Sequence, residues 1–212
     1  LALAVDNQTC LELGYSGRGL VAGNDHVAPL HPGFAKLGTA NYDPAQARSE
    51  LEAAGLKDYE HELVTLDDEW LRNTGDAVAA QLQDAGIAVR RSIKPGEQYW
   101  NNWQSYPFSV TEWNHRPLGL QALSLAYRST AVWNETGFAS EAFDSLLDRA
   151  MALNAADQRR ELMAELQRIL RDEGVIIQPY WRTLYNHHNG RLVGAERHPS
   201  NEIHLHQIGF IN

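Results

Sequence analysis

A short polar segment in the middle of the chain combines residue types that suit binding of a polar solute. Trp113 offers a flat apolar wall or a face for a cation, and Arg116 offers a planar fork of donors for a carboxylate or phosphate. Asn114 and His115 add donors and acceptors. The segment follows a predicted strand at 108–111, and open α/β sheets bind ligands just beyond the carboxyl ends of strands. We therefore expect these four residues to contact a solute; the alternative is a surface turn with a structural arginine.

No sequence pattern typical of an enzyme accompanies this segment. The chain lacks G-x-S-x-G, H-E-x-x-H and a phosphate-binding loop, and its serines and histidines occur separately. The single cysteine, Cys10, falls in a predicted helix and is interpreted as a small core residue. We expect no catalytic residues and no cofactor.

Two pairs of histidines raise the question of a metal site. His204 and His206 alternate, so on a strand both would point to one side and could chelate an ion. Neither this pair nor His187 with His188 has a cysteine or acidic residue at a known ligand spacing. We expect solvated histidines and no metal, with a histidine-liganded metal-binding protein as the less favoured alternative.

Length and composition limit the class of protein. The 212 residues, 43% hydrophobic and 21% charged, are typical of a folded domain rather than a disordered chain. The 18 basic and 27 acidic residues give a net charge of −9, which argues against a nucleic-acid partner. No apolar run approaches the roughly 20 residues of a membrane helix.

The apolar spacing predicts an α/β order of elements. Strands are expected at 61–66 and 87–93 with a helix at 74–85 between them, and such a unit makes its two strands parallel. A small mixed sheet flanked by helices is the expected architecture. Further expected elements are helices at 1–13, 44–54, 118–126, 140–153 and 155–172 and a buried strand at 175–180.

The start of the chain is also informative. The first predicted helix has no Ser, Thr, Asp or Asn ahead of it that could cap its amino end. Because the chain starts at Leu1 in such a helix and shows no signal peptide, we expect it to be part of a longer protein. The alternative is a processed or engineered terminus that frays.

Several segments, taken in order, resemble one protein family. They are ALAVD, YDPAQARSELEAAGL, AVAAQLQDAGIAVRRS, FSVTEWNHRP, WNETGFASEAFDSLLDRA, AADQRRELMAELQRILRDEG and VIIQPY. Together they are similar to the carboxy-terminal part of the extracytoplasmic solute-binding proteins of ATP-binding-cassette importers. The resemblance is to family 5, which captures peptides, nickel chelates and related solutes, and it covers nearly the whole chain.

This resemblance implies a periplasmic-binding-protein-like (type II) lobe. Family members trap a solute between two lobes joined by crossover strands, so residues 1–180 would be most of the second lobe. Residues 181–212 would be a tail that returns toward the first lobe. The implied function is solute capture in the periplasm, or outside the cell in association with the membrane, with a membrane permease as partner. A ligand-sensing or chaperone-type protein on the same scaffold is the alternative.

The resemblance also bears on the site. In many members the turn that matches 113–117 carries an acidic residue that holds a peptide's amino terminus, whereas this turn carries His115 and Arg116. That departure favours an anionic or sugar-containing solute. The segment with Trp133 and Asn134 faces the cleft in the family, so Trp133 would stack on solute and Asn134 would hydrogen-bond it. Alternatively, Trp133 packs under its loop and Asn134 caps a turn.

Overall fold

The computed structural model describes residues 1–211, and its strands form one parallel sheet and two antiparallel pairs. In the three-stranded sheet, β2 (His61–Leu66) lies between β3 (Val89–Lys94) and β4 (Ser109–Val110) and is parallel to both. The antiparallel pairs are β1 (Gly19–Val21) with β5 (Tyr180–Arg182) and β6 (Leu192–Val193) with β7 (Gly209–Phe210). The α/β class and the parallel strand–helix–strand unit are confirmed.

The helices lie close to the predicted ranges except at the start of the chain and at α3, which begins at Glu69 instead of 74. They are α1 (Asn7–Tyr15), α2 (Pro44–Ala53), α3 (Glu69–Asp84), α4 (Gly96–Asn102), α5 (Gly119–Ala126), α6 (Glu141–Ala152) and α7 (Ala156–Asp172), with 3-10 turns η1 (Ala2–Ala4) and η2 (Leu205–Gln207). The prediction of an uncapped first helix is wrong, because α1 begins at Asn7 and Asp6 caps it. The Asp6 carboxylate accepts hydrogen bonds from the backbone N–H groups of Gln8 and Thr9. These groups have no partner within the helix, which is why an aspartate stabilises this position.

The predicted strand at 175–180 is wrong for most of its length, since β5 begins only at Tyr180. The backbone before it bonds to an irregular segment instead of a neighbouring strand. Ala22 N–H donates to the Pro179 carbonyl, and Gln178 N–H donates to the Asn24 side chain over 2.8 Å. Pro179 itself has no N–H to give to a sheet. The residues before β5 therefore follow an extended path that side chains hold in place.

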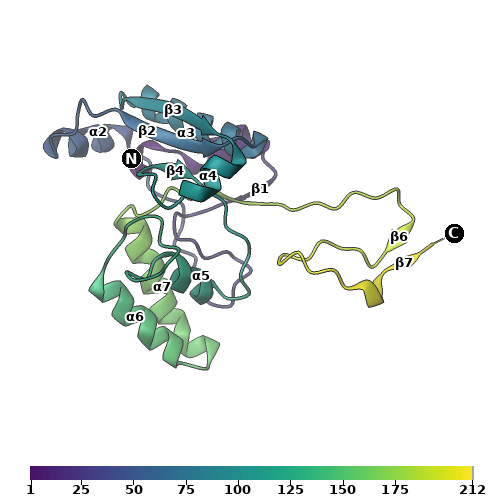
Figure 1. Ribbon diagram of the computed structural model, residues 1–212. Helices are drawn as coiled ribbons and strands as arrows, with labels where there is room; N and C mark the ends of the chain where they lie inside the picture. The colour runs from purple at the N-terminus through teal and green to yellow at the C-terminus, as the bar shows by residue number, and fades with distance from the viewer. Residues whose placement is uncertain (212) are drawn as a thin grey trace.

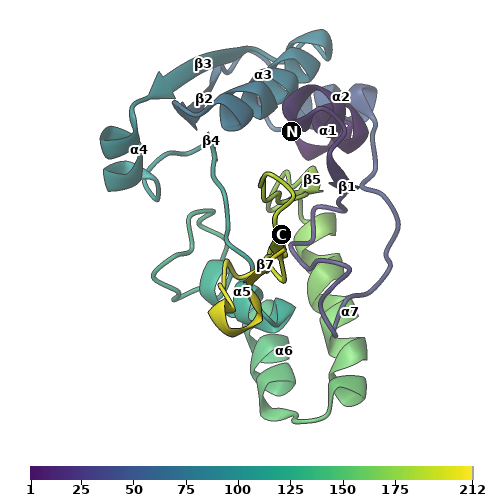
Figure 2. The same cartoon turned by 90° about the vertical axis from the view of Figure 1, so that its right-hand side faces the viewer.

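The apolar side chains form two separate cores at opposite ends of the molecule. One core lies between the parallel sheet and helices α1 and α3 and buries Leu63 and Leu82 completely. The other lies among α5, α6 and α7, where Phe143 and Leu147 are fully buried, and it also takes in Val27 from the irregular segment after β1. Figures 1 and 2 show the two units, joined by irregular segments. A cleft forms where they meet.

The end of the chain leaves both units as an extended tail, defined here as residues 184–211 (Figure 1). It carries the short β6–β7 pair and keeps large apolar side chains in solvent, with Leu205 77% and Phe210 79% exposed. None of the helices among residues 1–211 is both long and apolar enough to cross a lipid bilayer.

Candidate ligand-binding cleft

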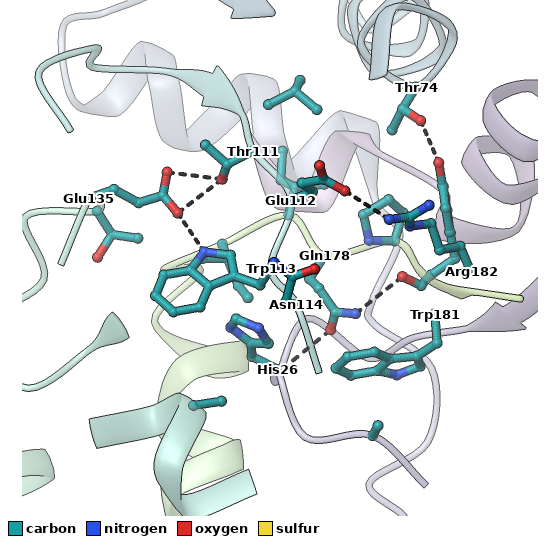
Figure 3. A pocket seen from close by; sticks show the side chains of 18 of the residues that line it. His26, Thr74, Thr111, Glu112, Trp113, Asn114, Glu135, Gln178, Trp181 and Arg182 are labelled. Carbon is teal, nitrogen blue, oxygen red and sulfur yellow. Dashed lines mark hydrogen bonds and ion pairs between the residues drawn. The ribbon is translucent and has the colours of Figure 1, made fainter. Parts of the chain in front are cut away.

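A cleft of about 1000 Å³ lies between the two units. Its walls are the turn after β4, residues 26–31, residues 174–182 and, from the tail, Arg197, Pro199 and Asn201. Figure 3 shows tryptophans and charged side chains turned toward one another across this space. Pockets that combine apolar walls with a few fixed polar groups are typical ligand sites.

The predicted turn lies in this cleft, and Trp113, Asn114, His115 and Arg116 all line it. The position follows from the sheet, because β4 ends at Val110 and the chain then leaves its carboxyl edge. Arg116 is half-buried, and its Nη1 lies 3.4 Å from the carbonyl oxygens of Asn114 and His115. Within residues 1–211 it forms no ion pair with a carboxylate, so its guanidinium fork is available to an anion.

A histidine pair supports the Arg116 end of the turn. His31 accepts a hydrogen bond from Ala28 N–H at Nδ1 (2.9 Å), so Nε2 carries the proton that it donates to the Arg116 carbonyl, also over 2.9 Å. The rings of His31 and His115 stack with centroids 5.3 Å apart. Burial lowers the pKa of both histidines, which keeps the pair neutral near pH 7.

Trp133 and Asn134 lie outside the residues that line the cleft. The Asn134 amide donates to the carbonyls of Arg128 and Phe138, so it closes its own loop. Trp133 is 43% exposed and meets the edge of Trp113 with ring centroids 6.0 Å apart. The residues of this segment that line the cleft are Glu135 and Thr136. The sequence interpretation missed Glu135, although it is the only charged residue between Arg128 and Glu141.

The sequence interpretation also missed an ion pair that spans the cleft wall. Glu112, beside the predicted turn, lies 2.8 Å from Arg182 at the end of β5, and each side chain is 32% exposed. The Arg182 guanidinium also lies over the Trp70 ring of α3, 4.6 Å from its centroid. Trp181 lines the cleft beside this pair (Figure 3). The sequence signal for these cleft residues was that Trp181 and Arg182 directly follow the predicted buried strand at 175–180.

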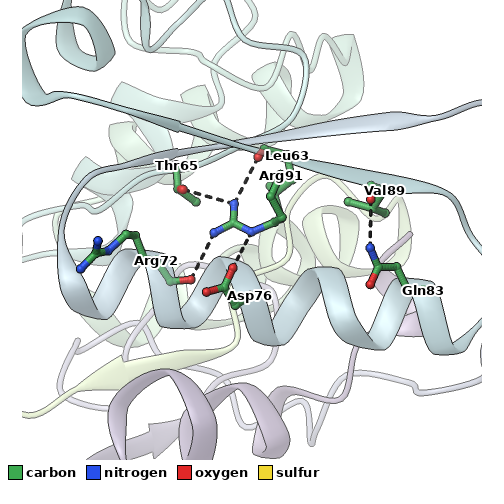
Figure 4. A network of polar contacts seen from close by, with 7 residues as sticks. All are labelled: Leu63, Thr65, Arg72, Asp76, Gln83, Val89 and Arg91. Atoms are coloured by element: carbon green, nitrogen blue, oxygen red, sulfur yellow. Dashed lines mark hydrogen bonds and ion pairs between the residues drawn. The ribbon is translucent and has the colours of Figure 1, made fainter.

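Helix α3, which carries Trp70, is fixed to the sheet by Arg91 of β3 (Figure 4). This guanidinium is 2.8 Å from the Asp76 carboxylate and also donates to the carbonyls of Leu63 and Arg72 over 3.2 Å. The Arg91 guanidinium lies so close to the backbone of α3 that a Cβ on Gly75 would be 2.8 Å from Arg91 Nη2. The helix that forms one cleft wall therefore has a defined position.

A strained turn places His26 under the Trp113 ring. Asn24 and His26 have positive φ angles of 60° and 54°, which cost free energy in residues other than glycine. The Asn24 side chain holds the turn, because it accepts from the Asn7 amide and from Gln178 N–H. His26 Nδ1 lies 2.6 Å from the Tyr127 hydroxyl, and burial lowers its pKa to about 4.

Asp25 in the same turn makes stability depend on pH. Burial raises the pKa of this carboxyl to about 6, so the folded chain binds its proton more tightly than the unfolded chain does. The associated stability is present at pH 4 and is lost as the pH rises through 6. His26 has the opposite sign, because its lowered pKa destabilises the fold as the pH falls below the usual value of 6.5.

We therefore expect Asp25→Asn to raise the free energy of unfolding at pH 8 by roughly 2 kcal/mol and to change it little at pH 4. The asparagine oxygen can still accept the bond that Val27 N–H donates to Asp25. Urea unfolding between pH 4 and 8 measures the difference, with Asp157→Asn, at a side chain 88% exposed, as control. Parallel pH curves for the native chain and Asp25→Asn would contradict the expectation.

The fold and the open cleft define a lobe of the type II periplasmic-binding-protein class. Residues 1–135 match the family "Bacterial extracellular solute-binding proteins, family 5 Middle". The chain therefore belongs to this extracytoplasmic family, whose members bind solutes rather than act as enzymes. No curated protein sequence matches the chain significantly.

Solved structures show the same fold at low sequence identity. The substrate-binding protein CtaP of Listeria monocytogenes has a TM-score of 0.84 at 15% identity, with 99% of this chain and 45% of that chain covered. The murein tripeptide binding protein MppA of Escherichia coli gives 0.82 at 19% identity, covering 100% and 44%. The oligopeptide-binding protein AppA of Bacillus subtilis, solved with a nonapeptide, gives 0.80 at 15% identity, covering 100% and 46%. The chain thus spans less than half the length of these proteins.

Proposed function

We propose that this chain is the second lobe of a two-lobed protein that captures a solute for an ATP-binding-cassette importer on the outer side of the membrane. Residues 1–180 form the lobe, and residues 181–212, of which Asn212 lies outside the described residues, return toward the first lobe. The exposed Leu205 and Phe210 support this arrangement, because a second lobe would remove them from water. The family membership and the peptide-binding proteins of like fold support the capture function.

The cleft favours an anionic solute with a flat face. The observation that carries this proposal is the Arg116 guanidinium, which lies in the cleft with no carboxylate partner among residues 1–211. The acidic groups of the wall are already engaged, Glu112 by Arg182 and Glu135 by Trp113. A carboxylate or phosphate would bind Arg116 while a ring or sugar packs on Trp113. Trp133 and Asn134, which do not line the cleft, are proposed to act through Trp113 and Glu135.

Closure of the two lobes would signal occupancy to the permease. A ligand that contacts both lobes binds the closed state more tightly, and this difference in affinity shifts the population toward closure. A sensor or chaperone on the same scaffold would use the same step with another partner. Import that stops when the permease is deleted, while binding continues, favours the transport function.

A thermal-shift screen of the complete two-lobed protein tests the proposal. Dipeptides, oligopeptides, sugar phosphates, opines and nickel chelates are compared at matched concentration. A ligand at about 100 times its Kd should stabilise the protein by roughly 2.7 kcal/mol, and we expect the anionic compounds to do so. Stabilisation by cationic peptides alone would contradict the anionic class, and stabilisation by no small solute would contradict capture.

A further inference from the structure

We propose that Glu135 is the positioning residue of the cleft, because its carboxylate selects the orientation in which the Trp113 indole is presented. The relevance of that orientation to a solute rests on the proposed function. The geometry itself does not depend on the proposed function, because it is a property of the chain without ligand.

The contacts of Glu135 are directed and converge on the turn. Oε1 accepts a hydrogen bond from Trp113 Nε1–H over 2.8 Å, and the Thr111 hydroxyl lies 2.9 Å from both carboxylate oxygens. One carboxylate thus holds the turn on both sides of Glu112 (Figure 3). A bond to an ionised acceptor is stronger than one between neutral groups, so this is the dominant polar contact of the indole.

The other neighbours of Trp113 are aromatic rings that meet it edge-on or the apolar core of α5, α6 and α7, and such contacts give no directed polar bond that would choose one ring orientation. His26, Trp103 and Trp133 lie with ring centroids 5.5, 6.4 and 6.0 Å from it. The terminal torsion of a tryptophan has broad, roughly two-fold preferences, and an indole turned over fills a similar volume. Only one orientation brings Nε1–H to Glu135, so the hydrogen bond decides between them.

The loop that carries Glu135 is built to keep the carboxylate in place. Asn134 donates to the carbonyls of Arg128 and Phe138, and its own oxygen accepts from the backbone and hydroxyl of Thr136. The loop is also joined to the end of α4 by a bond from the Gln104 amide to the Val132 carbonyl. Asn134 thus fixes the loop that carries Glu135, although neither Trp133 nor Asn134 lines the cleft.

Titration of Glu135 should be felt at the Trp113 indole. Burial raises the pKa of this carboxyl, while its bonds to Trp113 and Thr111 oppose the rise. The titratable groups facing it are Tyr99 of α4 and Tyr127, directly after α5, whose pKa values are raised, and His26 across the indole, whose pKa is lowered to about 4. Between pH 5 and 8 these three groups keep one charge state. Asp25, the neighbour of His26, has a pKa of about 6 and also titrates in this range. The pH dependence of Trp113 is therefore measured in the Asp25→Asn background, where it reports on Glu135.

The test uses the complete two-lobed protein labelled with 5-fluorotryptophan, without any solute. Trp113→Phe identifies the fluorine signal of Trp113 by its loss. We expect one sharp Trp113 signal that shifts with a midpoint above the usual glutamate value of 4.5. Glu135→Gln should keep one signal, because its amide oxygen still accepts from Nε1–H, but should lose the pH shift. Glu135→Ala should give two signals or one broadened signal, with stronger acrylamide quenching.

Controls separate positioning from a merely structural role. Glu141→Ala, an exposed carboxylate on α6, should leave the signal and its pH profile unchanged. If Glu135→Ala does not fold, the pH profile of Glu135→Gln decides alone. A single unshifted signal in Glu135→Ala, or a pH shift that persists in Glu135→Gln, would overturn the assignment. Because no solute is used, a failed solute screen would leave this result untouched.

Discussion

Arg116→Ala is expected to abolish stabilisation of the complete protein by any anionic solute that the screen identifies. A charge-assisted pair of hydrogen bonds in a half-enclosed cleft contributes about 3 kcal/mol, so the Kd should rise at least about 100-fold. The reason is the geometry of the cleft, in which the turn after β4 brings this cation to the wall without a carboxylate partner among residues 1–211. Isothermal titration calorimetry with the identified solute measures the change.

Two further variants make this result specific. Arg116→Lys keeps the charge but loses the planar fork, so it should restore only part of the affinity. Arg149→Ala, which removes an exposed arginine of α6 outside the cleft, should bind like the native protein. An unchanged Kd in Arg116→Ala would remove Arg116 from the site. Equal losses in Arg116→Ala and Arg149→Ala would assign the effect to net charge instead.

Phe143→Ala should cause the largest loss of stability among the variants considered. The Phe143 side chain is fully buried in the core of α5, α6 and α7 and meets the edge of Phe138 with centroids 5.3 Å apart. Truncation removes transferred apolar surface and leaves a cavity, which typically costs about 3–5 kcal/mol. For a chain of this size we expect a fall in Tm of about 10 °C. Because α5 begins three residues after Arg116, the cleft should lose a wall at the same time.

Calorimetry and near-ultraviolet circular dichroism measure the two effects of Phe143→Ala. Met151→Ala is the matched control, since it truncates a large apolar side chain that is 52% exposed on the same helix. We expect a small change in Tm for that variant. A similar small change for Phe143→Ala would mean that the helical core does not support the fold as described.

The elements that follow from local pattern were predictable from the sequence. Strand β2 has the predicted bounds, and helix α3 and strand β3 overlap the predicted ranges, although α3 begins five residues earlier than 74 and β3 two residues later than 87. The short connections make the two strands parallel. Asp43 and Ser140 cap the helices that they precede. The position of Trp113 to Arg116 at the edge of the sheet follows from the same reasoning.

Two predicted elements were wrong because hydrogen bonds that periodicity does not show decide where they begin. Asp6 has the neighbours of a helical residue, yet it satisfies two backbone N–H groups better as a cap. The apolar run before Tyr180 has the composition of a strand. Its backbone instead forms hydrogen bonds with the Asn24 side chain and the Ala22 N–H, both far away in the sequence. Periodicity carries no information about such partners.

The sequence by itself determined the α/β class, the family and the turn on which the cleft is built. Only the tertiary structure decided which side chains from other parts of the chain contact that turn and line the cleft. Glu112 meets Arg182 across 70 positions of sequence, His26 meets Tyr127 across 101, and Glu135 reaches Trp113 from a separate loop. The physical reason is that helices and strands form from contacts a few residues apart, whereas a binding site needs side chains that only the packed chain brings within hydrogen-bond distance.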